Sequence, residues 1–170
     1  MLQKNVVELL NEQINAEFYS AYLYLDFSSH FVDKGLEGFA NWFQVQAQEE
    51  RDHAMLFYQY LHNNNEHVTF RQIAQPDKPV AQPMDALQAS LEHEQYVTSR
   101  IHHIYDAAQE AKDFRTLQFL DWFVKEQGEE EKNATDLIQK MELFGSDPKS
   151  LYMLNTELAG RVYAPPSLVL

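Results

Sequence analysis

Near its middle, a long apolar helical pattern carries Gln46-Ala47-Gln48-Glu49-Glu50-Arg51-Asp52-His53. Alternating steps of four and three residues select one stripe: Phe39, Phe43, Gln46, Glu50, His53, Phe57 and Tyr60. Residues three and four apart share a helix face, so this stripe is expected to face a core. Since an ionised glutamate is costly to bury without a partner, the carboxylate and imidazole at its centre predict a bound metal ion.

Three other long apolar patterns carry a polar insertion near their midpoints. The insertions are Glu17 within residues 10–24, Glu94 within 87–105, and Gln127 with Glu130 within 120–144. In an aligned four-helix bundle the helix midpoints meet in one layer, whichever way each helix runs. Four carboxylates and one histidine are therefore predicted to converge.

The composition favours a packed globular chain. Its 170 residues are 45% hydrophobic and 13% aromatic, which predicts a single domain over residues 1–170 with a substantial core. A formal net charge of -13 disfavours nucleic acid and anionic membranes as partners, because both attract basic surfaces. The acidic surface could gather cations or simply maintain solubility.

Cellular location is read from the same sequence. Cysteine is absent, which excludes disulfides and thiolate sites. The stretch Met1-Leu2-Gln3-Lys4-Asn5 has no apolar signal core, and no apolar run is long enough to cross a bilayer. A cytoplasmic protein is expected.

The helical periodicity and its breaks predict an all-α fold. Four long helices form a bundle over about residues 5–144, a short fifth helix follows Gly145 and Pro148, and residues 160–170 form an irregular tail. The expected helices are Asn5–Phe31, Glu37–Leu61, Pro83–Ala111, Phe114–Phe144 and Lys149–Ala159. Gly128, inside the fourth helix, is unfavourable by ~1 kcal/mol relative to alanine, so a packing or access reason is expected for it.

The connection between the second and third helices is far longer than a helix hairpin needs. A helix of about 25 residues is roughly 38 Å long, and about 20 residues of extended chain can span that length. The segment carries Pro76, Pro79 and an extended-looking run, Val68-Thr69-Phe70. It is predicted to cross back along the bundle, so that the second and third helices run parallel, as in ferritin-like folds.

The donor set indicates which metal would bind. Iron accepts both carboxylate oxygen and imidazole nitrogen, whereas an all-oxygen site suits magnesium or calcium. One histidine among several glutamates points to iron, with manganese or zinc as competitors. Two ions are favoured over one, because four carboxylates would overcharge a single divalent ion and Glu50 could bridge two.

Taken together, these motifs resemble the non-haem bacterial ferritins over essentially the whole chain. The likeness rests on Asn15-Ala16-Glu17-Phe18-Tyr19, Glu49-Glu50-Arg51-Asp52-His53-Ala54, Glu94 and Glu126-Gln127-x-Glu129-Glu130. It implies a subunit that oxidises Fe(II) with dioxygen or hydrogen peroxide. It also implies that ferric mineral is stored inside a hollow homo-oligomer of twenty-four chains.

The resemblance also implies roles for individual residues. Glu17, Glu50 and His53 would hold the first iron of a di-iron centre. Glu50, Glu94 and Glu130 would hold the second, and Gln127 would hydrogen-bond beside the first. A third iron site would use Glu49, Glu126 and Glu129 together with Glu130; the alternative is a solvated acidic face. Tyr24 would donate a hydrogen bond or an electron near the centre; the alternative is a core aromatic residue.

Two departures separate the chain from bacterioferritins. Their fourth helix carries a second Glu-x-x-His, whereas here the pair is Gln127-x-x-Glu130, which leaves the second metal position all-oxygen. Their haem-ligating methionine is replaced by Arg51, so haem is not expected. The remaining histidines, including His93, His102 and His103, lie off the apolar stripe and are expected to face solvent.

Two other readings of the sequence stay open. One is a di-iron enzyme that keeps its metals and acts on peroxide or an organic substrate. The other is a helical bundle without enzymatic activity, whose acidic core buffers cations or mediates assembly. Aerobic addition of excess Fe(II) separates the three classes by the number of irons oxidised and retained per chain.

Overall fold

The computed structural model describes residues 2–170, which contain five helices and no strand. The helices are α1 (Lys4–Asp33), α2 (Glu37–Asn63), α3 (Pro83–Glu110), α4 (Phe114–Phe144) and α5 (Pro148–Leu158). The predicted all-α fold is confirmed, and each helix lies within one or two residues of its expected bounds. Within these residues no helix combines the length and apolarity that a bilayer crossing requires.

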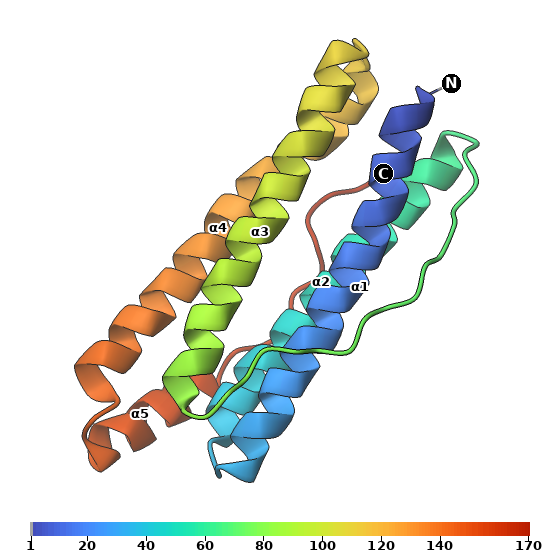
Figure 1. The fold of residues 1–170 in the computed structure, drawn as a ribbon. Coiled ribbons are helices and arrows are strands. Elements are labelled where there is room, and N and C mark those ends of the chain that lie inside the picture. Colours follow the sequence, from blue (N-terminus) through green and yellow to red (C-terminus); the bar gives the residue numbers. More distant parts are fainter. Residues whose placement is uncertain (1) are drawn as a thin grey trace.

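Two tight turns create two antiparallel helix pairs. Gly35, between α1 and α2, has φ +71°, a backbone conformation that glycine adopts without steric cost. Lys112, between α3 and α4, has φ +54° and is followed by Asp113, which caps α4 by accepting a hydrogen bond from the Thr116 N–H. Figure 1 shows the α1–α2 pair packed beside the α3–α4 pair.

The long connection between α2 and α3 is the predicted crossover. It leaves α2 at Asn64, runs along α1 and returns to the start of α3, so that α2 and α3 point the same way (Figure 1). Backbone groups of the crossover bind α1 side chains; for example, the Thr69 N–H donates to Asn11 Oδ1 at 2.7 Å. Gln82 and Asp85 then form a capping box at the start of α3.

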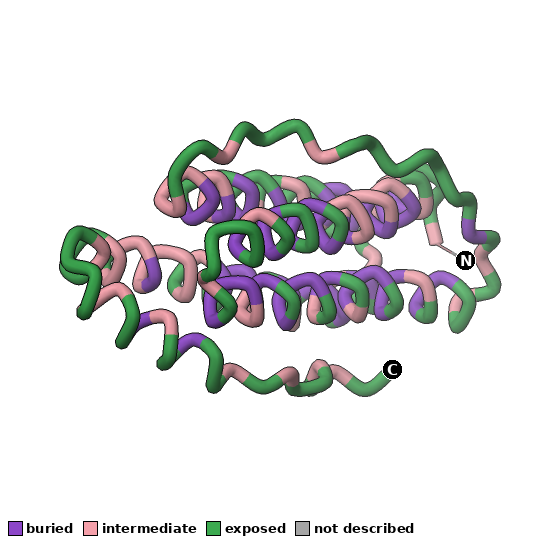
Figure 2. The backbone as a smooth tube through the Cα atoms, turned by 90° about the horizontal axis from the view of Figure 1, so that it is seen from below, coloured by how far each residue is buried: buried purple, intermediate pink, exposed green. Residues whose placement is uncertain are grey.

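The apolar core is divided by a polar layer. One cluster packs around Leu10, Phe57 and Phe123, and a second packs around Phe27 and Phe43. In Figure 2 the buried residues lie on the inner faces of the helices. The glutamates of the polar layer therefore lie between two apolar regions, where ionised groups are poorly solvated.

The C-terminal region packs across α2 and α4. Asn155 of α5 caps α2, because its Oδ1 accepts hydrogen bonds from the Gly38 and Phe39 N–H groups at 2.8 and 3.3 Å. After α5 the tail runs along the side of the bundle opposite the crossover (Figure 2). Tail contacts include a hydrogen bond from Trp122 Nε1 to Ser167 Oγ at 3.0 Å.

Candidate metal centre

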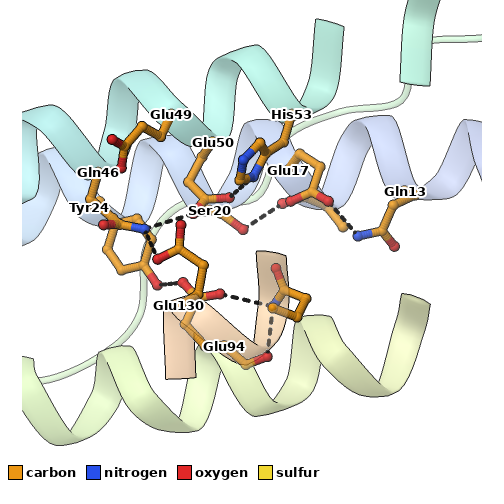
Figure 3. Close-up of polar contacts among 12 residues, drawn as sticks. Gln13, Glu17, Ser20, Tyr24, Gln46, Glu49, Glu50, His53, Glu94 and Glu130 are labelled. Carbon is orange, nitrogen blue, oxygen red and sulfur yellow. Dashed lines mark hydrogen bonds and ion pairs between the residues drawn. The ribbon is translucent and has the colours of Figure 1, made fainter. Parts of the chain in front are cut away.

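Four carboxylates, one from each long helix, meet in the polar layer. Glu17, Glu50, Glu94 and Glu130 are 1%, 1%, 2% and 5% exposed, and Figure 3 shows them turned toward one another. Amphipathic periodicity explains their placement, since each occupies a core-facing position of its helix. The structure thus brings together the carboxylates that the sequence predicts to converge.

His53 joins this group from α2. Glu17, Glu50 and His53 each offer a ligand atom, and these atoms all lie within 4.8 Å of one another. His53 Nδ1 is 3.4 Å from Glu50 Oε2. Trp122 and Phe123 pack against the imidazole ring in T-shaped arrangements, with centroid distances of 5.6 and 5.8 Å. The ring is thereby held in one orientation toward the carboxylates.

The residues predicted for a third iron position differ in burial and do not all lie close together. His53, Glu126 and Glu130 form a second group whose ligand atoms lie within 4.8 Å of one another. Glu126 is half-buried, whereas Glu129 is exposed and belongs to neither group. Glu49 is half-buried and pairs with Arg161 of the tail. The third position therefore remains a prediction for Glu49, Glu126 and Glu129.

Amide donors form hydrogen bonds with some carboxylate oxygens of the centre and not with others. Gln13 Nε2 donates to Glu17 Oε1 at 2.8 Å, and Gln46 Nε2 donates to Glu130 Oε2 at 2.7 Å and Glu50 Oε1 at 3.2 Å. Among the described residues, Glu17 Oε2 and Glu50 Oε2 are buried and accept no hydrogen bond. Buried polar atoms are rarely left unsatisfied, so these two oxygens fit a metal-binding role.

Burial and mutual repulsion disfavour the ionised carboxylates. Burial, followed by the charge of Glu50, raises the pKa values of Glu17 and Glu94 to about 8. Burial and Glu94 raise the pKa of Glu130 to about 8, and burial with Glu130 raises the pKa of Glu50 well above its ordinary value. A cation placed among these groups would reverse this effect, because opposite charge favours the ionised form.

Tyr24 and Gln127 both hold Glu94. The Tyr24 hydroxyl donates to Glu94 Oε1, and burial raises the pKa of that hydroxyl well above its ordinary value. Gln127 Nε2 donates to Glu94 Oε2 and to the Glu94 carbonyl, each at 3.2 Å. The sequence assigned Gln127 to the side of the first iron, but the structure places it against a ligand predicted for the second.

The family of this chain follows from its sequence matches. The sequence profile of the Ferritin family, described as a ferritin-like domain, matches residues 7–144. The chain belongs to the ferritin family. It is 36% identical over 163 residues to a bacterial non-heme ferritin of Staphylococcus aureus strain USA300, covering 96% of this chain and 98% of that protein. A bacterial non-heme ferritin of Staphylococcus saprophyticus is 37% identical over the same length and coverage.

Solved ferritin structures share the fold of this ferritin-family chain. An open-pore ferritin from the archaeon Archaeoglobus fulgidus is 42% identical, with a TM-score of 0.93 over 95% of this chain and 100% of that chain. A form of Archaeoglobus fulgidus ferritin engineered to be closed gives a TM-score of 0.94 at 42% identity, over 96% and 100%. The predicted resemblance to non-haem bacterial ferritins is therefore confirmed, and the fold is shared with archaeal ferritins.

The prediction that His93 faces solvent is wrong. His93 is 6% exposed, and its Nε2 lies 2.8 Å from Ser20 Oγ, across the interface between α1 and α3. Burial lowers its pKa to about 4, and Lys78 adds to this effect. His102 and His103 are exposed, as predicted. The burial of His93 was not predicted because α1 covers a wider part of the α3 surface than the single apolar stripe of that helix.

Gln13, Gln46 and Arg161 contact carboxylates in or beside the polar layer although the sequence predicted no role for them. A spacing signal existed for the two glutamines, since each stands four residues before a buried glutamate on its helix face, Gln13 before Glu17 and Gln46 before Glu50. No such signal exists for Arg161, which meets Glu49 from a position 112 residues away in the chain.

Proposed function

We propose that this ferritin-family chain is an iron-storage subunit with ferroxidase activity. The observation that carries the proposal is the convergence of Glu17, Glu50, Glu94, Glu130 and His53 in one buried layer. Family membership supports iron storage. The buried oxygens Glu17 Oε2 and Glu50 Oε2, which accept no hydrogen bond among the described residues, support metal binding at this layer.

Iron ions are the substrate of the proposed centre. Glu17, Glu50 and His53 would take one Fe(II), and Glu50, Glu94 and Glu130 would take a second, with Glu50 shared. Each Fe(II) gives up one electron to dioxygen or hydrogen peroxide. Carboxylate oxygens are hard ligands that suit Fe(III), so the donor set favours the oxidised product. Glu49, Glu126 and Glu129, with Glu130, would form a third iron position beside the pair.

Proton movement follows from the carboxyl groups themselves. Glu17, Glu94 and Glu130 have pKa values of about 8, so at neutral pH they carry protons while no cation is near. A carboxyl group must lose its proton to bind a metal through both oxygens. Binding of iron would therefore release protons, and the Tyr24 hydroxyl would keep Glu94 oriented throughout.

We further propose that the chain forms one ferritin-like domain. Copies of it would assemble into a homo-oligomer of twenty-four chains, which is the family pattern. The assembly is proposed to lie in the cytoplasm. An exposed apolar stripe on α1 supports assembly, since Tyr22, Leu25 and Val32 are 54%, 49% and 52% exposed along one side of the helix. Exposed apolar patches of this kind mark interaction surfaces, and a second copy of the chain is the proposed occupant.

The test is aerobic addition of excess Fe(II) to the metal-free assembled protein. Many irons oxidised and retained per chain are expected, with rapid initial oxygen uptake. At most two irons per chain would indicate an enzyme that keeps its metals, and none above background would indicate a bundle without this activity. Both outcomes contradict iron storage.

The first matched variant is His53→Ala, with His103→Ala as control because His103 is exposed. His53→Ala is expected to slow initial oxygen uptake by at least about tenfold, in line with loss of a metal ligand, while the native particle size is kept. Uptake equal to that of His103→Ala would remove His53 from the proposed centre.

A further inference from the structure

Arg161, the first tail residue to reach the metal centre, is bound on several sides by α2. Its Nη2 donates to Glu49 Oε2 at 2.5 Å, and its Nη1 donates to Gln46 Oε1 at 2.9 Å and to the Trp42 carbonyl at 3.2 Å. The guanidinium also lies over the Trp42 ring, 4.1 Å from the centroid. These contacts fix both the charge and the direction of the side chain.

The backbone of Arg161 is also anchored. Asn41 Nδ2 donates to the carbonyl of Arg161 at 3.0 Å and to that of Leu158, the last residue of α5, at 3.2 Å. Asn155 ties α5 to the first turn of α2. The guanidinium is thus held in place by the fold itself, and its side chain is only 16% exposed.

The carboxylate of Glu49 forms an ion pair with the Arg161 guanidinium. In Figure 3 the Glu49 carboxylate turns toward Gln46, on the side of Glu50 away from His53. The group that could hold a metal beside the central pair consists of His53, Glu126 and Glu130 and does not include Glu49. The carboxylate that would complete the third position is therefore already neutralised from within the chain.

We propose that Arg161 is a built-in competitor for iron at Glu49 and so keeps the third position weaker than the central pair. This inference rests on the proposed function, and it adds a residue that determines the order in which the positions fill. A guanidinium repels a divalent ion beside it, and the repulsion is twice that on a monovalent ion because it scales with the product of the charges. Iron at Glu49 must displace Arg161 or share the carboxylate with it.

The opposite role, in which Arg161 orients Glu49 for metal binding, is the weaker one. Groups that orient a metal ligand from outside form hydrogen bonds with it, and their loss typically costs about 10–100-fold in metal affinity. Here the orienting group is itself a cation in a half-buried place, where charges are screened less than at the surface. Repulsion is therefore expected to outweigh orientation.

The experiment titrates the assembled metal-free protein with Zn²⁺, which is not oxidised, and follows the heat of each binding step. Wild type is expected to bind two tight ions and a third more weakly, and the third is assigned by its loss in Glu126→Gln. Arg161→Gln should tighten the third step at least tenfold. Arg161→Lys, which keeps the charge, should stay within about threefold of wild type.

Arg51→Gln is the matched control, because it removes one arginine charge from α2 at a side chain that is 62% exposed. It should leave the third step unchanged. A third step in Arg161→Gln that is equal to or weaker than that of wild type would overturn the inference. So would equal changes in Arg161→Gln and Arg161→Lys accompanied by equal losses of thermal stability, since these indicate a purely structural role.

The two proposals fail in different ways. Absence of the two tight zinc ions from wild type would overturn the proposed di-iron centre itself. Two tight ions that persist in every variant, with a third step indifferent to Arg161, would overturn only the role of Arg161.

Discussion

Two glutamines hold the carboxylates of the centre in the same way. Gln13 Oε1 accepts from Arg100 Nε at 2.9 Å, and Gln46 Oε1 accepts from Arg161 Nη1 at the same distance. An amide whose oxygen binds an arginine must present its nitrogen to the other side. Each glutamine therefore directs an N–H donor at the buried glutamate one turn along its helix, and this preorganises the carboxylates.

Replacement of Glu130 with Gln tests the cost of burying a titratable carboxyl group at one residue of the centre. The change removes one of four buried carboxylates, while Gln46 keeps an oxygen acceptor at the same place. We expect metal-free protein to gain about 1–2 kcal/mol of stability and to melt a few degrees higher. The initial rate of Fe(II) oxidation should fall at least about tenfold. Calorimetry and oxygen uptake measure the two effects.

Glu142→Gln is the control for this variant, because Glu142 lies on the same helix and is exposed. It should alter neither the melting temperature nor the rate. A Glu130→Gln protein that melts below wild type would contradict the view that burial of the Glu130 carboxyl group is costly in the absence of metal.

At the scale of elements, α5 matters because it carries the tail to the centre. Its approach to α2 is close: a Cβ added to Gly38 would lie 1.6 Å from the Asn155 carbonyl oxygen. Only a residue without a side chain permits this contact, in which Asn155 caps α2. The orientation of α5, and through it the position of Arg161, depends on that glycine.

Gly38→Ala, in the first turn of α2, and Gly128→Ala, inside α4, form a pair of substitutions at helical glycines. Gly38→Ala should force α5 away from α2 and cost several kcal/mol, as other overpacking changes do. A Cβ added to Gly128 has no neighbour within 4 Å, so Gly128→Ala should raise stability by up to about 1 kcal/mol through helix propensity. Among residues 2–170, therefore, nothing packs closely enough against Gly128 to explain why glycine stands there.

Thermal melts and limited proteolysis of the C-terminal region measure the outcome for the pair. Gly38→Ala should melt lower and lose the tail to protease faster than wild type does. If the two alanine variants behaved alike, the described contact between α5 and α2 would be wrong.

Over the whole molecule, the buried titratable groups set the pH dependence of stability. The carboxyl pKa values of Glu17, Glu94 and Glu130 rise from 4.5 to about 8 on folding. The folded state then binds more protons than the unfolded state between these values, so stability falls as pH rises through that window. His93 acts in the opposite sense, since its pKa falls from 6.5 to about 4 and its contribution is lost as pH drops below 6.5.

From pH 6.5 to pH 8 the three carboxyl groups outweigh His93, whose protonation differs between the folded and unfolded states only at the lower end of this range. Each pKa unit is worth about 1.4 kcal/mol, so metal-free protein should melt at least about 5 °C lower at pH 8 than at pH 6.5. Calorimetry in chelator-treated buffer gives this difference. Zn²⁺ should abolish it, and Glu130→Gln should reduce it. A melting temperature that is flat or rises over this range would refute the assignment.

The sequence by itself determined the helices, the crossover and the set of residues that enter the polar layer. Glu17, Glu50, His53, Glu94 and Glu130 are found where helical periodicity placed them, because which face a residue occupies is a local property of the chain. Gly35 and Pro83 mark helix boundaries for the same local reason, through backbone conformation.

Only the tertiary structure decided which atoms meet within that layer and around it. Gln127 contacts Glu94, His93 is buried against Ser20, and Arg161 neutralises Glu49. Each of these contacts joins segments far apart in the chain. Their geometry depends on how the helices and the tail pack and on which side-chain rotamers that packing allows. The periodicity of one segment predicts neither of these.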